Sequence, residues 1–133
     1  MSRLRLSPPK AQTEHCLVVN IPFEFDINGE TLPPGKYILK QSSSDKPEIL
    51  SIDRRDGRRG EFVLTSSIRA GAVQPESKLV FHRYGDRYFL SQVWEAGDDE
   101  GRELPKSRRE RALERELAKN GSKSQTVAVI GQK

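Results

Sequence analysis

The sequence predicts a mainly β fold, a single small antiparallel β-sandwich or barrel of about six strands, with a helix appended at its C-terminal end. Three observations predict this fold. Apolar and polar residues alternate along residues 17–27. Short runs of β-branched and aromatic residues then recur about every 8 to 12 residues, with turn signals between them. A heavily charged segment with a capping pattern follows the last of these runs.

The first expected strand has the clearest pattern in the chain. Between residues 17 and 27, apolar side chains occupy every second position, and polar residues occupy most of the positions between them. Because successive side chains of a strand point to opposite faces, this alternation places one face on a core and the other in water. Pro22 cannot donate a backbone hydrogen bond, so the strand is expected to be an edge or to carry a bulge there.

The other expected strands are short apolar runs bounded by turn-forming residues. Asn28-Gly29, Pro34-Gly35 and Asp56-Gly57 are typical turn sequences, and Asp-Gly in particular favours a hairpin. A tight turn at residues 84–87 joins the last two runs. The five runs lie at residues 37–39, 49–52, 62–65, 79–81 and 88–90.

The helix is predicted from its two ends. Ser107 and Glu110 form a Ser-x-x-Glu capping box, which satisfies backbone donors of the first turn, and Asn120-Gly121 supplies a C-terminal stop. The helix is therefore expected over about residues 106–119. Only a narrow apolar stripe runs along it, so it should lie on the sheet or project from it.

Two arginines stand at an unfavourable place in this helix. Arg108 and Arg109 fall in its first turn, where the helix dipole disfavours positive charge by some tenths of a kcal/mol. Three carboxylates, at residues 98–100, lie just upstream. We expect this acidic loop to fold back onto the two arginines.

The chain divides into three parts by composition. Residues 1–15 form a polar, proline-interrupted leader that is expected to be flexible. Residues 16–120 hold the β-domain with its C-terminal helix, and residues 121–133 form a tail in which residues 126–130 could return as a short strand. The leader has no apolar region of the signal-peptide kind, and no apolar run of about 18 residues could span a membrane. As written, the chain is predicted to be cytoplasmic.

The composition limits the chemistry that the chain could support. The net charge of +4, from 23 basic and 19 acidic residues, permits binding to polyanions without requiring it. A single cysteine excludes a disulfide framework and any Cys-x-x-Cys site, and two histidines are a poor supply for zinc. No glycine-rich phosphate loop is present. The sequence therefore predicts no catalytic residues, no metal site and no cofactor.

Four short phrases of the sequence stand out as a set, in this order along the chain: residues 19–25, 32–37, 78–86 and 102–107. As a set they resemble a family of small uncharacterised bacterial β-rich proteins, and the resemblance covers residues 17–120. The resemblance implies a fold type and no assigned activity. Many members of that family begin with a secretory signal peptide, which implies a periplasmic or secreted protein if the true start lies upstream.

The densest polar and aromatic cluster lies across the expected hairpin of residues 79–90. Such residues could bind an anion or a sugar through guanidinium, imidazole and phenol groups, and an exposed tryptophan could stack on a ring. The alternative is that cross-strand pairs stabilise the hairpin and that the tryptophan belongs to the core. The candidate ligand-binding residues are His82, Arg83, Tyr84, Asp86, Arg87, Tyr88 and Trp94.

A second candidate site surrounds the Asp56-Gly57 turn. Its four guanidinium groups could bind phosphate, although charged residues at an exposed turn more often serve solvation. No aromatic residue lies between them, so nucleic-acid binding is not favoured. The candidate anion-binding residues are Arg54, Arg55, Arg58 and Arg59.

Taken together, these observations favour a non-catalytic structural or binding module, with an envelope role if the family is exported. Its partner is unknown, and a sheet edge or the charged helix could bind a protein or a second copy of the chain. One alternative is an anion or nucleic-acid binder that uses the arginines of residues 54–59 and of the helix. The other is an enzyme or small-ligand binder with a pocket near His82.

Overall fold

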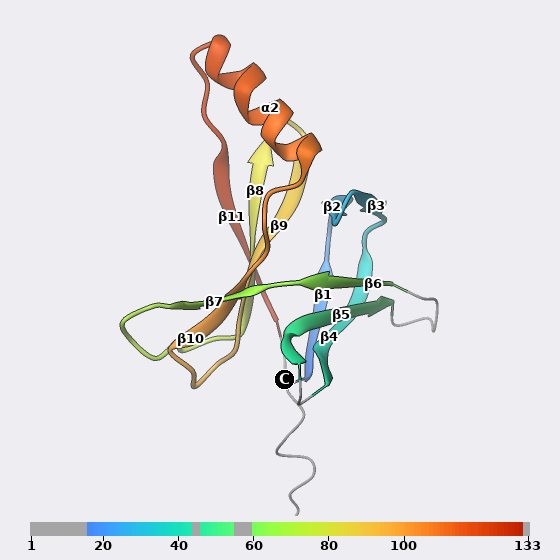
Figure 1. Cartoon of the computed structure of the whole chain (residues 1–133), viewed down its shortest axis with the longest axis vertical. Helices are drawn as coiled ribbons and strands as arrows, with labels where there is room; N and C mark the ends of the chain where they lie inside the picture. The colour runs from blue at the N-terminus through green and yellow to red at the C-terminus, as the bar shows by residue number, and fades with distance from the viewer. Residues whose placement is uncertain (1–15, 44–45, 55–59, 132–133) are drawn as a thin grey trace, which may run out of the picture.

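A computed structural model describes residues 16–43, 46–54 and 60–131 of the 133-residue chain. In that part it contains eleven strands and one helix (Figure 1). The elements in chain order are β1 (Cys16–Ile21), β2 (Phe25–Ile27), β3 (Glu30–Leu32), β4 (Gly35–Ser43), β5 (Lys46–Arg54), β6 (Glu61–Leu64), β7 (Ser66–Arg69), β8 (Lys78–Tyr84), β9 (Arg87–Trp94), β10 (Glu100–Glu103), α2 (Arg108–Lys119) and β11 (Gln125–Ile130).

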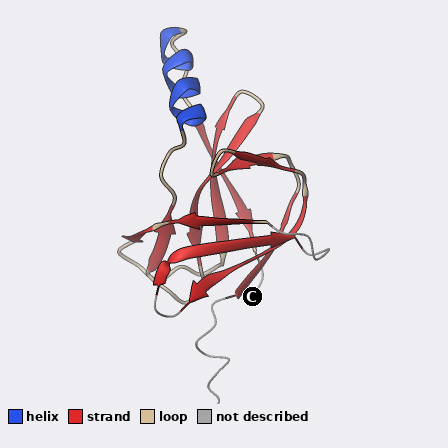
Figure 2. Cartoon of the chain, turned by 45° about the vertical axis from the view of Figure 1, so that its right-hand side comes forward, coloured by secondary structure: helices blue, strands red, loops and turns tan. Residues whose placement is uncertain are grey.

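The strands form two sheets that share one core (Figures 1 and 2). One sheet has the order β1-β4-β5-β6 and the other β11-β8-β9-β10-β7, with the small β2–β3 hairpin joined to β9 by a parallel bridge between Asp26 and Phe89. Only Thr65 separates β6 from β7, so the chain passes there from one sheet to the other. In the described residues the two sheets remain separate and do not close into a barrel. The predicted mainly β fold with a C-terminal helix is confirmed, although its strands outnumber the expected six.

The first predicted strand is two strands in different sheets. β1 is an edge strand that pairs with β4, as expected from Pro22, which follows it directly. The chain then turns at residues 22–24 and enters the other sheet as β2. The apolar alternation is still correct, because its members other than the half-buried Phe23 are almost completely buried. They are Leu17, Val19, Ile21, Phe25 and Ile27.

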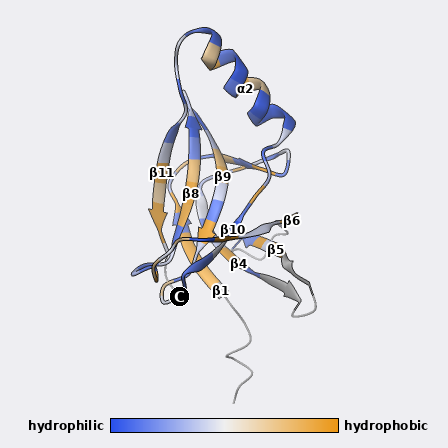
Figure 3. Cartoon of the chain, turned by 60° about the vertical axis from the view of Figure 1, so that its left-hand side comes forward, coloured by the Kyte–Doolittle hydropathy of each residue, from blue (hydrophilic) through white to orange (hydrophobic). Residues whose placement is uncertain are grey.

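Aromatic side chains fill much of the space between the sheets. Phe25 meets Tyr37 of the facing sheet and Phe81 of its own, both edge to face, with ring centroids 5.2 and 5.7 Å apart. Such edge-to-face pairs add to the stability that burial already provides. Figure 3 shows the apolar residues concentrated on the strands, whereas α2 is largely hydrophilic.

Helix α2 begins and ends as its sequence predicts. The Ser107 Oγ accepts a hydrogen bond from the backbone N–H of Glu110 at 3.2 Å. At the other end, Gly121 has a φ of +76°, and the N–H groups of Gly121 and Ser122 donate to the carbonyls of Ala118 and Leu117. This pairing is a Schellman motif, and it turns the chain into β11, which pairs with β8.

Candidate functional site

The candidate residues of the β8–β9 hairpin do not converge on one site. His82 and Tyr84 share one face of β8, and Arg83 between them points to the other face of the sheet. Cross-strand pairing places Arg87 beside Tyr84 and Tyr88 beside Arg83. The hairpin therefore divides its polar residues into two sets. The outer set, against which α2 packs, is His82, Tyr84 and Arg87, and the inner set is Arg83 and Tyr88. Asp86 is exposed at the turn between them.

The outer face carries a buried carboxylate, which we call the Glu110 cluster: Glu110, His82 and Tyr84. Glu110 is 3 % exposed, and its Oε2 accepts a hydrogen bond from the Tyr84 hydroxyl at 2.8 Å. The same oxygen lies 2.9 Å from Nδ1 of His82. Burial, followed by the hydrogen bond to Glu110, raises the pKa of Tyr84 well above its ordinary value. The tyrosine therefore stays a proton donor at neutral pH, and the cluster fixes the first turn of α2 on β8.

A second buried carboxylate forms the Asp26 cluster: Asp26, Thr31, Arg87 and Arg109. Asp26 is 2 % exposed. Its Oδ2 accepts from Arg87 at 3.0 Å and from Arg109 at 2.7 Å, while its Oδ1 accepts from the Thr31 hydroxyl at 3.1 Å. One side chain of β2 thus holds β3, β9 and α2 together.

The Asp26 cluster corrects the expectation for the start of the helix. Arg109 is neutralised by Asp26, not by the acidic loop of residues 98–100. Within that loop Asp99 lies 3.7 Å from Arg69, and Asp98 accepts from the backbone N–H of Glu100. The loop is therefore held locally, and the partner of Arg109 comes from a residue 83 positions earlier in the chain.

The inner set of the hairpin forms an aromatic stack. The rings of Phe23 and Tyr88 are nearly parallel, with centroids 3.8 Å apart. The Arg83 guanidinium lies 5.6 Å from the Tyr88 centroid, and its Nε donates to the carbonyl of Gly85. These contacts are the cross-strand stabilisation that the hairpin pattern also allowed.

Trp94 is a buried residue of β9. It is 6 % exposed, and its indole N–H donates to Gln92 at 2.9 Å. Its ring covers Gly101 of β10, where an added Cβ would lie only 2.6 Å from the ring. Trp94 therefore presents no exposed ring for stacking.

The arginine-rich turn lies mostly outside the described residues. Arg55, Arg58 and Arg59 belong to the segment 55–59, of which the structure describes nothing. Arg54 ends β5 and is half-buried.

The β6 strand forms an edge of the four-stranded sheet with two exposed apolar side chains. Phe62 is 57 % exposed and Leu64 is 62 % exposed, while Val63 between them is buried. The amide of Asn28 donates to the Phe62 carbonyl at 3.2 Å, so a side chain already occupies part of this edge. The expected sheet edge thus exists, with one of its backbone acceptors satisfied.

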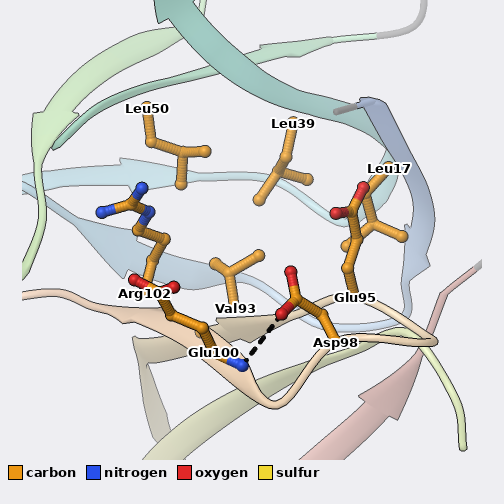
Figure 4. A pocket seen from close by; sticks show the side chains of 9 residues that line it. Leu17, Leu39, Leu50, Val93, Glu95, Asp98, Glu100 and Arg102 are labelled. Atoms are coloured by element: carbon orange, nitrogen blue, oxygen red, sulfur yellow. Dashed lines mark hydrogen bonds between the residues drawn. The ribbon is translucent and has the colours of Figure 1, made fainter. Parts of the chain in front are cut away.

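A cavity that the sequence did not suggest lies between the two sheets, at the end opposite to the hairpin turn (Figure 4). Its volume is about 220 Å³. Apolar side chains from β1, β4, β5 and β9 line one part of it, and polar side chains from β10 and the loop before it line the rest. We call it the inter-sheet cavity, and its lining residues are Leu17, Leu39, Leu50, Val93, Glu95, Asp98, Glu100, Gly101 and Arg102.

Arg102 enters this cavity because of the strand register. It pairs with Val93, so the two side chains share the face of the sheet that looks toward the core. In Figure 4 the guanidinium lies at one end of the cavity beside Leu50. Across the described chain it has no hydrogen bond and no ion pair with another residue. A register that placed arginine opposite a core valine was not visible in the sequence, because β10 contains no apolar residue.

The carboxylates lie in two parts of the cavity: Figure 4 draws the Glu100 carboxylate on the Arg102 side and those of Asp98 and Glu95 on the other side. The Asp98 Oδ1 accepts from the backbone N–H of Glu100 at 3.1 Å, and the Glu100 carboxylate accepts from the Ser67 hydroxyl. Figure 4 shows Asp98 and Glu95 directed into the cavity near Leu17, away from the guanidinium. The cavity therefore has an apolar wall, one end with the Arg102 guanidinium and the Glu100 carboxylate, and another end with the carboxylates of Asp98 and Glu95.

Comparison of the chain with family models, curated proteins and solved structures finds no match. Among the described residues, no helix is both long enough and apolar enough to cross a bilayer. Over the same ranges, no three His, Cys, Asp or Glu side chains are grouped as a metal site requires.

Proposed function

We propose that the protein is a non-catalytic binding module, and that it holds a small ligand with an anionic group and an apolar part in the inter-sheet cavity. The observation that carries this proposal is Arg102. Its guanidinium faces the core side of the sandwich, beside Leu50, without a protein partner in the described residues.

A guanidinium in such surroundings favours an anionic partner. Carboxylates and phosphates match its planar donors, and the interaction strengthens where apolar walls exclude water. The cavity is also large enough for a ligand. An engineered cavity of about 150 Å³ holds benzene, and the inter-sheet cavity measures about 220 Å³.

The polar clusters elsewhere support binding over catalysis. General acid–base chemistry needs a titratable group that can reach a substrate. The two most deeply buried carboxylates of the described residues, Glu110 and Asp26, instead bind side chains of neighbouring elements. His82, the obvious proton carrier of the hairpin, contacts Glu110. These groups therefore stabilise the fold.

The experiment that tests this proposal uses n-hexanoate, an anion with a short apolar tail. For a ligand of this size we expect a Kd of about 1 mM. Hexanoate at 20-fold that concentration should then stabilise the protein by about 1.8 kcal/mol. The chain has one tryptophan, Trp94, and its fluorescence reports the unfolding.

Arg102→Gln should abolish this stabilisation, because the amide keeps polarity and loses the charge. The matched control is Arg111→Gln, which removes an exposed arginine from α2 and should leave the effect unchanged. An equal effect of hexanoate on the Arg102 variant and on the wild type would contradict the proposal, as would no effect on either protein.

We also propose that the chain belongs to the small bacterial family that it resembles, with a role at the cell envelope. The four phrases that carry the resemblance support this proposal, and each covers a structural transition. They span the end of β1, the entry to β4, the hairpin of β8 and the approach to the N-terminus of α2. The native protein should then be found in the periplasmic or secreted fraction of its host. Recovery from the cytoplasm alone would contradict the envelope role.

A further inference from the structure

We infer that the ligand of the inter-sheet cavity is a zwitterion, with its anionic group at Arg102 and an ammonium group at Asp98. This inference rests on the proposed function and names its ligand class. It depends on the cavity, on the unpaired guanidinium and on the position of the carboxylates relative to both.

The charges around the cavity favour a zwitterion over a simple anion. Two carboxylates besides that of Glu95, those of Asp98 and Glu100, share the lining with the guanidinium of Arg102. An anion bound at Arg102 would be repelled by these carboxylates, and the apolar walls would reduce the screening by water. A ligand that also carries an ammonium group converts this repulsion into attraction.

The two charged ends lie apart from one another. In Figure 4 the guanidinium is beside Leu50, whereas Asp98 and Glu95 lie toward Leu17. Leu39 and Val93 occupy the space between them. The Arg102 guanidinium at one end, the apolar side chains in the middle and the Asp98 carboxylate at the other end match a ligand whose two charges are separated by a short hydrocarbon chain.

The Asp98 carboxylate is already oriented for such a ligand. Its Oδ1 accepts the Glu100 N–H at 3.1 Å, which fixes the side chain against the loop. Its other oxygen makes no hydrogen bond with any residue of the described ranges. An ammonium group can therefore bind to Oδ2 without displacing a protein donor.

The size of the cavity defines the length of the ligand. If about 150 Å³ accommodates the six carbons of benzene, then 220 Å³ accommodates about nine non-hydrogen atoms. An unbranched ω-amino acid of six carbons, 6-aminohexanoate, has about that size and carries its two charges at opposite ends. The same chemistry occurs in a lysine side chain whose own α-carboxylate is free.

The test compares three probes by isothermal titration calorimetry with the full chain. These are 6-aminohexanoate, n-hexanoate, which lacks the ammonium group, and n-hexylamine, which lacks the carboxylate. The wild type should bind 6-aminohexanoate at least about tenfold more tightly than either single-charge probe, which corresponds to one charge-assisted contact. The preference should decrease at high salt.

Two variants separate the two ends. Asp98→Asn keeps the oxygen that accepts from Glu100, so the loop should stay folded while the negative charge is lost. In this variant the affinity for 6-aminohexanoate should fall about tenfold, to that of hexanoate, and hexanoate should bind no more weakly than before. In Arg102→Gln the affinity for 6-aminohexanoate should instead fall to that of hexylamine. Asp99→Asn, outside the cavity lining, is the matched control and should change neither affinity.

The outcomes distinguish the inference from the function on which it rests. If hexanoate binds as tightly as 6-aminohexanoate, the inferred zwitterion is wrong and the proposed anion site stands. If hexylamine binds most tightly and its affinity is the same in the wild type and in Arg102→Gln, the proposed function is wrong too. If no probe binds at 20 mM, both are wrong. The probe series needs only the wild-type chain, so it remains decisive if a variant fails to fold.

Discussion

Replacement of Glu110 by alanine should detach the N-terminal turn of α2 from β8. The side chain is 3 % exposed, and its Oε2 is shared by the Tyr84 hydroxyl and the His82 ring. Alanine favours helix formation, and the Ser107 cap uses only the backbone N–H of position 110. The substitution therefore removes the side-chain contacts of this position and leaves the local helix signals in place.

The expected loss is about 3 kcal/mol in the free energy of unfolding. A hydrogen bond to a charged group contributes about 1.5–3 kcal/mol, so two such bonds give about 3–6 kcal/mol. The lower end applies because His82 is 26 % exposed at its side chain and can turn to water. Tyr84 is 3 % exposed, so its hydroxyl loses a partner that water does not easily replace.

Urea unfolding followed by Trp94 fluorescence measures this loss. The matched control is Glu114→Ala, one turn further along the same helix. Its carboxylate pairs at 2.8 Å with Lys106, and both side chains are substantially exposed, so the change should leave the unfolding free energy close to that of the wild type. A Glu110→Ala protein within about 0.5 kcal/mol of the wild type would show that α2 is not held by this carboxylate. Proteolysis within α2 should increase for Glu110→Ala and not for the control.

Three further predictions concern single side chains. The pKa of Tyr84 is higher in the folded than in the unfolded chain. Its contribution to the free energy of unfolding is therefore complete below pH 10, and it is lost as the pH rises above that value, by up to about 1.4 kcal/mol per pH unit. Alkaline titrations of stability should therefore be flatter for Tyr84→Phe than for the wild type. Asp26→Ala should lower the unfolding free energy by about 2 kcal/mol in urea titrations. This loss is smaller than that from breaking a fully buried ion pair, because Arg87 and Arg109 are 41 % and 46 % exposed at their side chains and can bind water instead. Gly101→Val should destabilise by about 1–3 kcal/mol and shift the tryptophan emission, because its Cβ would lie 2.6 Å from the indole ring.

Local patterns predicted the elements that depend on neighbouring residues. The alternation of residues 17–27 identified their buried faces, because side-chain parity is fixed by the strand itself. The capping pattern at Ser107 and the glycine stop at Gly121 identified the ends of α2 for the same reason. What parity did not show was the change of sheet after β1, since an alternating pattern continues through a short break.

The parts that the sequence did not predict depend on distant residues. β10 and β7 are polar segments that become strands by pairing with each other, and β10 also pairs with β9. Arg109 finds its carboxylate on β2, 83 positions away. The capping box suggested that the Glu110 side chain would turn back to its own helix, but the carboxylate binds Tyr84 and His82 of β8. The cavity at Arg102 follows from the register of β10 and was therefore not accessible from the sequence.

The two groups of charged residues lie at opposite ends of β9. Arg87, in the Asp26 cluster, begins the strand, and Val93, in the cavity wall, stands six residues further on, which corresponds to about 20 Å. Arg87 and Arg109 are paired with Asp26 near the helix, whereas Arg102 at the far end is unpaired within the described chain. Sites this far apart without shared partners contribute independently to the free energy. The helix contacts can therefore stabilise the sandwich without influencing the cavity, and the cavity can carry unpaired charge without weakening the attachment of the helix.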